Sequence, residues 1–172
     1  MILITGANGQ LGTELRHLLD ERNEEYVAVD VAAVDKKYSA LQDYLSKSDI
    51  NGMQFLEVDE HNKGLRTNFL VEGQTLPVFV VVNETVYSYI QVHLVTITPD
   101  KLAKCLPLLN ELNDSFTMLK YGVNKGGNII LTCSIPAGDD KFDPAIIFAL
   151  LDQINGHLQE HYKLLMKKIW EE

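Results

Sequence analysis

The sequence has 172 residues and a formal net charge of −9, with 46% hydrophobic and 23% charged residues. This composition is typical of a globular protein, and the length suits one domain, or one domain with an N-terminal attachment. The negative charge argues against nucleic acids and anionic membranes as partners, because both bind cationic surfaces. No segment has the roughly 20 apolar residues that a membrane-spanning helix needs, so we expect a cytoplasmic protein.

The N-terminal residues predict a strand, a glycine-rich turn, a helix and a second strand. Residues 1–5 are an apolar strand, Gly6, Gly9 and Gly12 follow, and the second strand ends at Asp30. In a nucleotide-binding βαβ unit, such glycines permit a tight turn, close approach of a pyrophosphate and close packing of helix on strand. The helix N-terminus attracts the phosphates, and Asp30 stands about where a ribose-binding carboxylate belongs.

The segment MILITGANGQLGTEL resembles the start of extended short-chain dehydrogenases, and most closely that of dTDP-4-dehydrorhamnose reductases. The resemblance covers about the first 31 residues and implies that Gly6, Gly9 and Gly12 bind NAD(P)H. One functional hypothesis is therefore an NAD(P)-dependent sugar-nucleotide reductase, or a non-catalytic remnant of one. The alternative is a truncated βαβ segment that serves for packing, in which case we expect no cofactor.

The same resemblance implies a catalytic Tyr-x-x-x-Lys pair on a helix, in which the lysine lowers the pKa of the tyrosine. Tyr121 and Lys125 have this spacing. However, Gly122 and the glycines at residues 126–127 disfavour a helix by about 1 kcal/mol each, and the sequence NKGG favours the turn of a hairpin. The further parallel strands of a dinucleotide-binding sheet are also missing. We therefore assign no catalytic residue.

From residue 35 onward, the sequence predicts an α+β domain with helices packed on an antiparallel sheet. An amphipathic helix over residues 35–48 comes first, with Asp35 as its cap. Residues 54–97 then contain four short apolar segments separated by turn residues. Their β-branched and aromatic residues alternate partly with polar ones, which is typical of an antiparallel meander with one wetted face.

A second helix, a hairpin and a long helix follow the meander. The tripeptide TPD at residues 98–100 predicts a helix start, because it supplies a cap, a proline at the first helical position and an acid. Two apolar segments, at residues 117–123 and 128–135, are predicted to form the strands of the hairpin, with the sequence NKGG as its turn. The dipeptide DP at residues 143–144 predicts another helix start, with a cap followed by a proline at the first helical position. Apolar residues then recur every three or four positions, so this helix is predicted to end at about residue 169.

This order of elements resembles the YbjN family of bacterial sensory transduction regulators, whose fold is that of type III secretion chaperones. The resemblance is carried by the strand pair at residues 76–97 and by the segments LLNELNDSF, KYGVNKGGNIILTCSIPAGD and FDPAIIFALLDQINGHLQEHY. It implies a non-enzymatic, chaperone-like or regulatory module that binds another protein. The predicted organisation is a truncated Rossmann-like βαβ segment at residues 1–34 and a YbjN-like chaperone-type domain at residues 35–172.

The last predicted helix carries a long apolar stripe. Its length from residue 143 to 169 is roughly 40 Å, whereas strands of five or six residues span only about 20 Å. Soluble monomers rarely leave so long a stripe exposed. We therefore expect the N-terminal arm, a second copy of the chain or another protein to cover it. The predicted partner-binding residues are Ile154, Leu158, Tyr162, Leu165 and Ile169.

The remaining candidate chemistry is a possible metal site. His157 and His161 are one helical turn apart, which is the spacing of a metal-binding pair. A solvated flank of the last helix is the alternative, since no HExxH motif is present. We therefore predict no metal site. The two cysteines, Cys105 and Cys133, are expected to be buried thiols in a reducing compartment.

Overall fold

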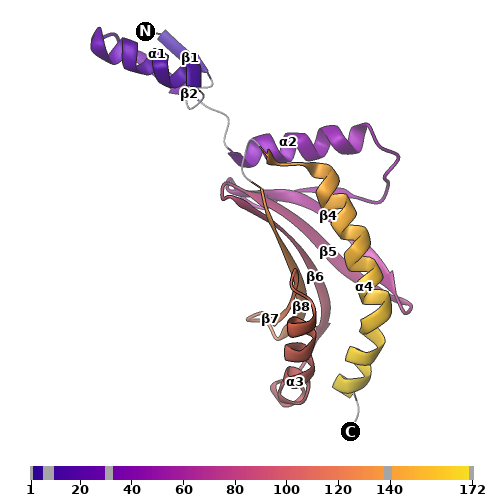
Figure 1. Cartoon of the computed structure of the whole chain (residues 1–172). Helices are drawn as coiled ribbons and strands as arrows, with labels where there is room; N and C mark the ends of the chain where they lie inside the picture. Colours follow the sequence, from indigo (N-terminus) through magenta and orange to yellow (C-terminus); the bar gives the residue numbers. More distant parts are fainter. Residues whose placement is uncertain (1, 6–9, 30–32, 138–140, 171–172) are drawn as a thin grey trace.

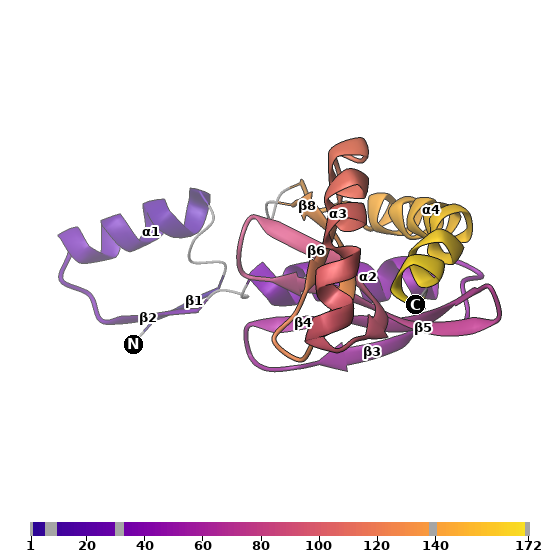
Figure 2. The same ribbon diagram turned by 90° about the horizontal axis from the view of Figure 1, so that it is seen from below.

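The computed structural model describes residues 2–5, 10–29, 33–137 and 141–170, which form two separate sheets. The smaller sheet is a parallel pair, with a helix between its strands in the chain: β1 Ile2–Thr5, α1 Gln10–Glu21 and β2 Tyr26–Val29. Ile4 and Leu19 form the small core of this βαβ unit, and Tyr26 packs against them. Figures 1 and 2 show the βαβ unit standing apart from the rest of the described chain.

The larger sheet has six antiparallel strands in the order β3-β4-β5-β6-β8-β7. Their bounds are β3 Gln54–Glu57, β4 Asn62–Val71, β5 Gln74–Asn83, β6 Tyr87–Thr96, β7 Leu119–Val123 and β8 Asn128–Pro136. The first four strands pair in chain order, and the β7–β8 hairpin joins through β8 to β6. The predicted α+β fold with an antiparallel meander and a following hairpin is therefore confirmed.

The helices of the larger part pack against one face of this sheet. They are α2 Ala33–Ser46, α3 Pro99–Ser115 and α4 Pro144–Trp170. Side chains alternate between the two faces of a strand, and Val78, Val80 and Val82 of β5 point into a single buried cluster with the helices. Figure 1 shows α4 running alongside the strands, with α2 across one end of the sheet and α3 near the other.

The two helix starts that contain proline lie where they were predicted. Thr98 is the N-cap of α3, although its side chain makes no capping hydrogen bond, and the helix begins at Pro99. At the start of α4, the backbone N–H of Ala145 donates to Asp143 Oδ1 at 2.9 Å. This bond satisfies one of the N–H groups that a helix start leaves without an intrahelical partner.

The start of α2 differs from the prediction. The helix begins at Ala33, and Asp35 lies in its first turn instead of capping it. The Asp35 carboxylate pairs with the ammonium of Lys63 on β4, so it fixes α2 to the sheet. Val34 is part of the larger buried cluster, and the boundary predicted between residues 34 and 35 thus falls inside the first turn of α2. The division into two domains stays a prediction.

The expectation that α4 extends past the sheet, and so leaves its apolar stripe for the N-terminal arm or a partner to cover, is wrong. Strands β4, β5 and β6 have 10 residues each, not five or six, and so span about 33 Å. They are nearly as long as the 27-residue helix α4, which is about 40 Å long. The side chains predicted to bind a partner are buried in the chain's own core: Ile154, Leu158, Tyr162, Leu165 and Ile169.

Among the described residues, no helix combines the length and the apolar character that crossing a membrane requires.

Candidate functional site

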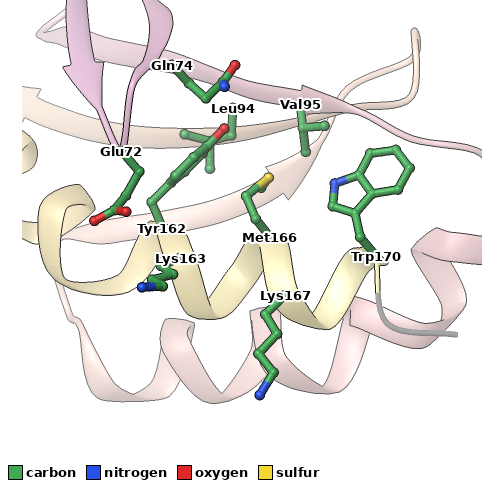
Figure 3. Close-up of a pocket in the computed structure, with 9 residues that line it drawn as sticks. All are labelled: Glu72, Gln74, Leu94, Val95, Tyr162, Lys163, Met166, Lys167 and Trp170. Carbon is green, nitrogen blue, oxygen red and sulfur yellow. The ribbon is translucent and has the colours of Figure 1, made fainter.

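A groove of about 640 Å³ lies between the C-terminal half of α4 and the strands. It is lined by residues of α4, of the β4–β5 turn, of the start of β5 and of β6, namely Glu72, Gln74, Leu94, Val95, Tyr162, Lys163, Met166, Lys167 and Trp170. Its volume is within the range of ligand-binding pockets. Figure 3 shows the strands on one side of this groove and α4 on the other.

The α4 wall of the groove includes Tyr162, Met166 and Trp170, which are four residues apart and so lie on successive turns of the helix, together with Lys163 and Lys167. Tyr162 is buried at one end, where Figure 3 shows its ring reaching toward Gln74 and Leu94. Trp170 is 55% exposed at the other end, beside Val95. The side chains of this wall are therefore buried at the Tyr162 end and exposed to solvent at the Trp170 end.

The β4–β5 turn places an acidic side chain at the Tyr162 end of the groove. Val71 pairs with Gln74, so Glu72 and Gly73 form a two-residue hairpin loop. Their φ angles are +49° and +78°, which is the pattern of a type I′ turn. Glycine adopts such angles without strain, whereas glutamate loses roughly 1 kcal/mol. This strained turn holds the Glu72 carboxylate beside α4 (Figure 3).

A cation lies at the opposite end of the groove. The ammonium of Lys101, on α3, is 3.8 Å from the centroid of the Trp170 ring. At this distance the ring attracts the cation electrostatically. The groove therefore has an apolar floor of Leu94 and Val95 with charged groups of both signs at its ends. Burial raises the pKa of Tyr162, so its hydroxyl stays protonated at neutral pH.

The predicted nucleotide-binding residues are only partly described by the structure. Gly6, Gly9 and Asp30 lie outside the described residues. Gly12 is buried in α1 of the βαβ unit, as expected of a glycine that permits close packing of a helix on a strand. Their binding of a cofactor stays a prediction.

Tyr121 and Lys125 do not form a helical catalytic pair. Tyr121 belongs to β7, and Lys125 lies in the turn that leads to β8. The Tyr121 ring is buried on the helix side of the sheet, where its hydroxyl lies 2.7 Å from Nε2 of His157. Burial raises the pKa of Tyr121, so the hydroxyl stays protonated where it contacts the imidazole. Its surroundings are those of a core residue.

The two histidines of α4 contact each other and an aromatic ring. The His157 and His161 rings are 4.6 Å apart, and both pack against Phe116. Burial, together with the nearby charge of His161, lowers the pKa of His157 to about 4. Within the described part of the chain, no three metal-binding side chains come together. Neither histidine is a fully solvated flank residue, since each is partly buried.

Sequence reasoning missed the groove because its walls come from segments that are distant in the chain. The sequence contains the turn at Glu72 and the end of the helix at Trp170, but nothing local indicates that the two segments line one groove. The positive φ of Glu72 is a signal that only the structure reveals.

The comparison with known families matches the N-terminal part of the chain. A family model described as "RmlD substrate binding domain" matches residues 1–53. A search of curated proteins gave no match. The N-terminal part is therefore similar to the dTDP-4-dehydrorhamnose reductases, as predicted, but the similarity extends beyond the first 31 residues and includes α2. The resemblance of residues 35–172 to the YbjN family gains no support and stays a hypothesis.

The lowered pKa of His157 predicts a pH-dependent stability. Below its ordinary pKa of 6.5 and above about 4, the unfolded chain binds this proton more readily than the folded chain, so stability falls as the pH falls. Urea unfolding between pH 7 and pH 4 should show a smaller loss for His157→Gln than for the unmutated protein. His17→Gln, an exposed control in α1, should behave like the unmutated protein. An identical pH dependence for His157→Gln would contradict the assignment.

Proposed function

We propose that this chain is a non-enzymatic protein-binding module whose groove at α4 binds a short apolar segment of a protein partner. The observation that carries the proposal is the wall of Tyr162, Met166 and Trp170, which becomes exposed toward Trp170. Tyrosine, tryptophan and methionine are enriched at protein interfaces, and tryptophan and tyrosine are common among the residues that dominate binding energy.

The chemistry of the groove favours a peptide over other ligands. Leu94 and Val95 offer an apolar floor, while Glu72 and Gln74 can accept hydrogen bonds from peptide N–H groups. The unbranched side chain of Met166 adapts to partner side chains of different shapes. The net charge of −9 disfavours nucleic acids. A peptide segment with one large apolar side chain between Met166 and Trp170 would contact the apolar floor, and its backbone N–H groups could donate to Glu72 and Gln74.

The chaperone-like or regulatory role that the YbjN resemblance implies agrees with this proposal. A cytoplasmic location agrees with the two cysteines, because Cys105 and Cys133 are both buried and unbonded and would stay reduced there.

Trp170 is the chain's single tryptophan, so its fluorescence reports directly on the groove. We expect peptides selected from a phage-displayed dodecamer library against the full chain to contain a large apolar residue and to shift Trp170 emission to shorter wavelength. Met166→Glu should weaken binding at least tenfold, because it places a carboxylate on the apolar wall. Leu164→Glu, an exposed position elsewhere on α4, is the matched control and should bind normally. Selected peptides that bind both variants equally would refute the groove as the site.

Nucleotide binding by the βαβ unit is a second candidate, and the family match to residues 1–53 favours it. A parallel strand pair with its intervening helix is the arrangement in which a helix N-terminus holds phosphate. Gly6, Gly9, Gly12 and Asp30 would supply the close approach and the ribose contact. A dinucleotide, however, binds between two such halves. The larger described sheet is antiparallel and offers no second half.

We therefore expect weak NADPH binding at most, and no turnover of NADPH with a dTDP-4-keto sugar. Calorimetric titration of the full chain with NADPH, with Gly9 intact and with Gly9→Val, measures the first expectation. Any heat of binding should disappear in Gly9→Val, since a side chain there obstructs the pyrophosphate. NADPH oxidation that is abolished by Tyr121→Phe would overturn this account and assign the chain to the reductases.

A further inference from the structure

The face of the six-stranded sheet opposite the helices, hereafter the open face, has an unusual charge composition. One row of cross-strand neighbours defines it: Arg66, Phe79, Gln91, Thr132 and Lys120. Strands β4 to β8 contain no aspartate or glutamate, although the chain as a whole carries a net charge of −9. Glu57 of the edge strand β3 is the cross-strand neighbour of Lys63, which pairs with Asp35 on the helix side, so the six described strands place no acid on the open face.

The centre of the open face is aromatic and hollowed. The Arg66 guanidinium lies 5.8 Å from the centroid of the Phe79 ring, and the His93 ring lies 5.2 Å from it. A hollow of about 230 Å³ adjoins Phe79 and is lined in part by Leu56, Gly64 and Val81. Residue 64 must be glycine, because a Cβ there would lie 1.8 Å from the carbonyl oxygen of Val80. A hollow of this kind accepts an apolar side chain.

The βαβ unit carries an apolar stripe that nothing in the described chain covers. Leu11, Leu15 and Leu18 of α1 are 82%, 39% and 46% exposed. Their spacing of four and then three residues places them on one side of the helix, and only Gly12 and Leu19 of α1 are buried. The stripe is set in an acidic segment, since QLGTELRHLLDERNEEYVAV contains five acids and two arginines.

The βαβ unit is also incomplete as a structure. Parallel sheets occur almost only where both faces are covered, and two strands are marginal on their own. Here a parallel pair is covered on one face by one short helix, and that helix leaves its leucines in solvent. Docking of the unit onto another surface would cover the stripe and stabilise the pair.

We propose that the chain forms a two-fold dimer in which the α1 leucine stripe of each copy docks on the open face of the other. A second copy is the occupant that the observations favour, because every chain carries both the acidic segment with its leucine stripe and the open face with its apolar hollow. The charges are complementary, because the acids of the βαβ unit would lie opposite Arg66, whereas the Lys120 ammonium donates to the carbonyl oxygens of Asn113 and Phe116 at the end of α3. Two identical reciprocal contacts close under two-fold symmetry, so the assembly stops at a dimer.

Light scattering of the full chain over a range of concentrations tests this proposal. Leu11→Glu combined with Leu18→Glu places charges on the stripe, and Arg66→Glu reverses the charge of the open face. Both changes are at exposed positions, so the fold should persist, which circular dichroism checks. We expect the unmutated protein and the exposed control Leu164→Glu to dimerise, and each variant to dimerise at least tenfold more weakly. A protein that is monomeric at every concentration, including one whose α1 folds back on its own sheet, would overturn the proposal.

Mixing the two variants distinguishes this contact from other dimers. The stripe variant keeps an intact open face, and Arg66→Glu keeps an intact stripe, so a mixed pair retains one of the two contacts. Fluorescently labelled stripe variant should therefore bind Arg66→Glu more tightly than either variant binds itself. A dimer built from two stripes or from two open faces would show no such recovery, and that result would contradict the proposal.

Discussion

The match in length between α4 and the central strands is the constraint on which the rest of the structure depends. Three strands of 10 residues give the sheet enough length to cover the apolar stripe of a 27-residue helix. With Leu158 and Leu165 buried on the sheet, α2 and α3 pack beside α4 and complete one core. The groove opens where α4 reaches Trp170, and the other face of the sheet is left uncovered by these three helices.

The helix α2 belongs both to the segment that matches the RmlD family model and to the core of the antiparallel sheet. The family match ends at residue 53 and so includes α2, yet α2 is part of the antiparallel core. Val34 and Leu41 are fully buried there, and the Lys37 ammonium donates hydrogen bonds to the carbonyl oxygens of Asn83 and Thr85. Within the described residues, the reductase-like start is therefore attached to an antiparallel core without the further parallel strands that a dinucleotide-binding sheet needs. The match shows that residues 1–53 are similar to this family, and it does not show the activity of the chain.

Features set by neighbouring residues could be predicted from the sequence, and features set by distant residues could not. The cap at Asp143, the hairpin after Tyr121 and the alternation in β5 depend on a few adjacent side chains, and all are present. Strand length depends on pairing with strands elsewhere in the chain, so the sequence predicts strands of five or six residues where β4, β5 and β6 have 10. The meeting of Glu72 with α4, and of Tyr121 with His157, depends on the whole topology. Of the glycine loop, only Gly12 lies within the described residues.

Hydrogen exchange along α4 tests the central claim most directly, namely that this helix is covered by the sheet over nearly its whole length. The account predicts that backbone amides around Leu158 and Leu165 exchange as slowly as those of β5 and β6, because all open only when the shared core unfolds. If the amides beyond Leu158 exchanged rapidly while β5 and β6 stayed protected, the C-terminal half of α4 would extend past the sheet, and the account would be contradicted.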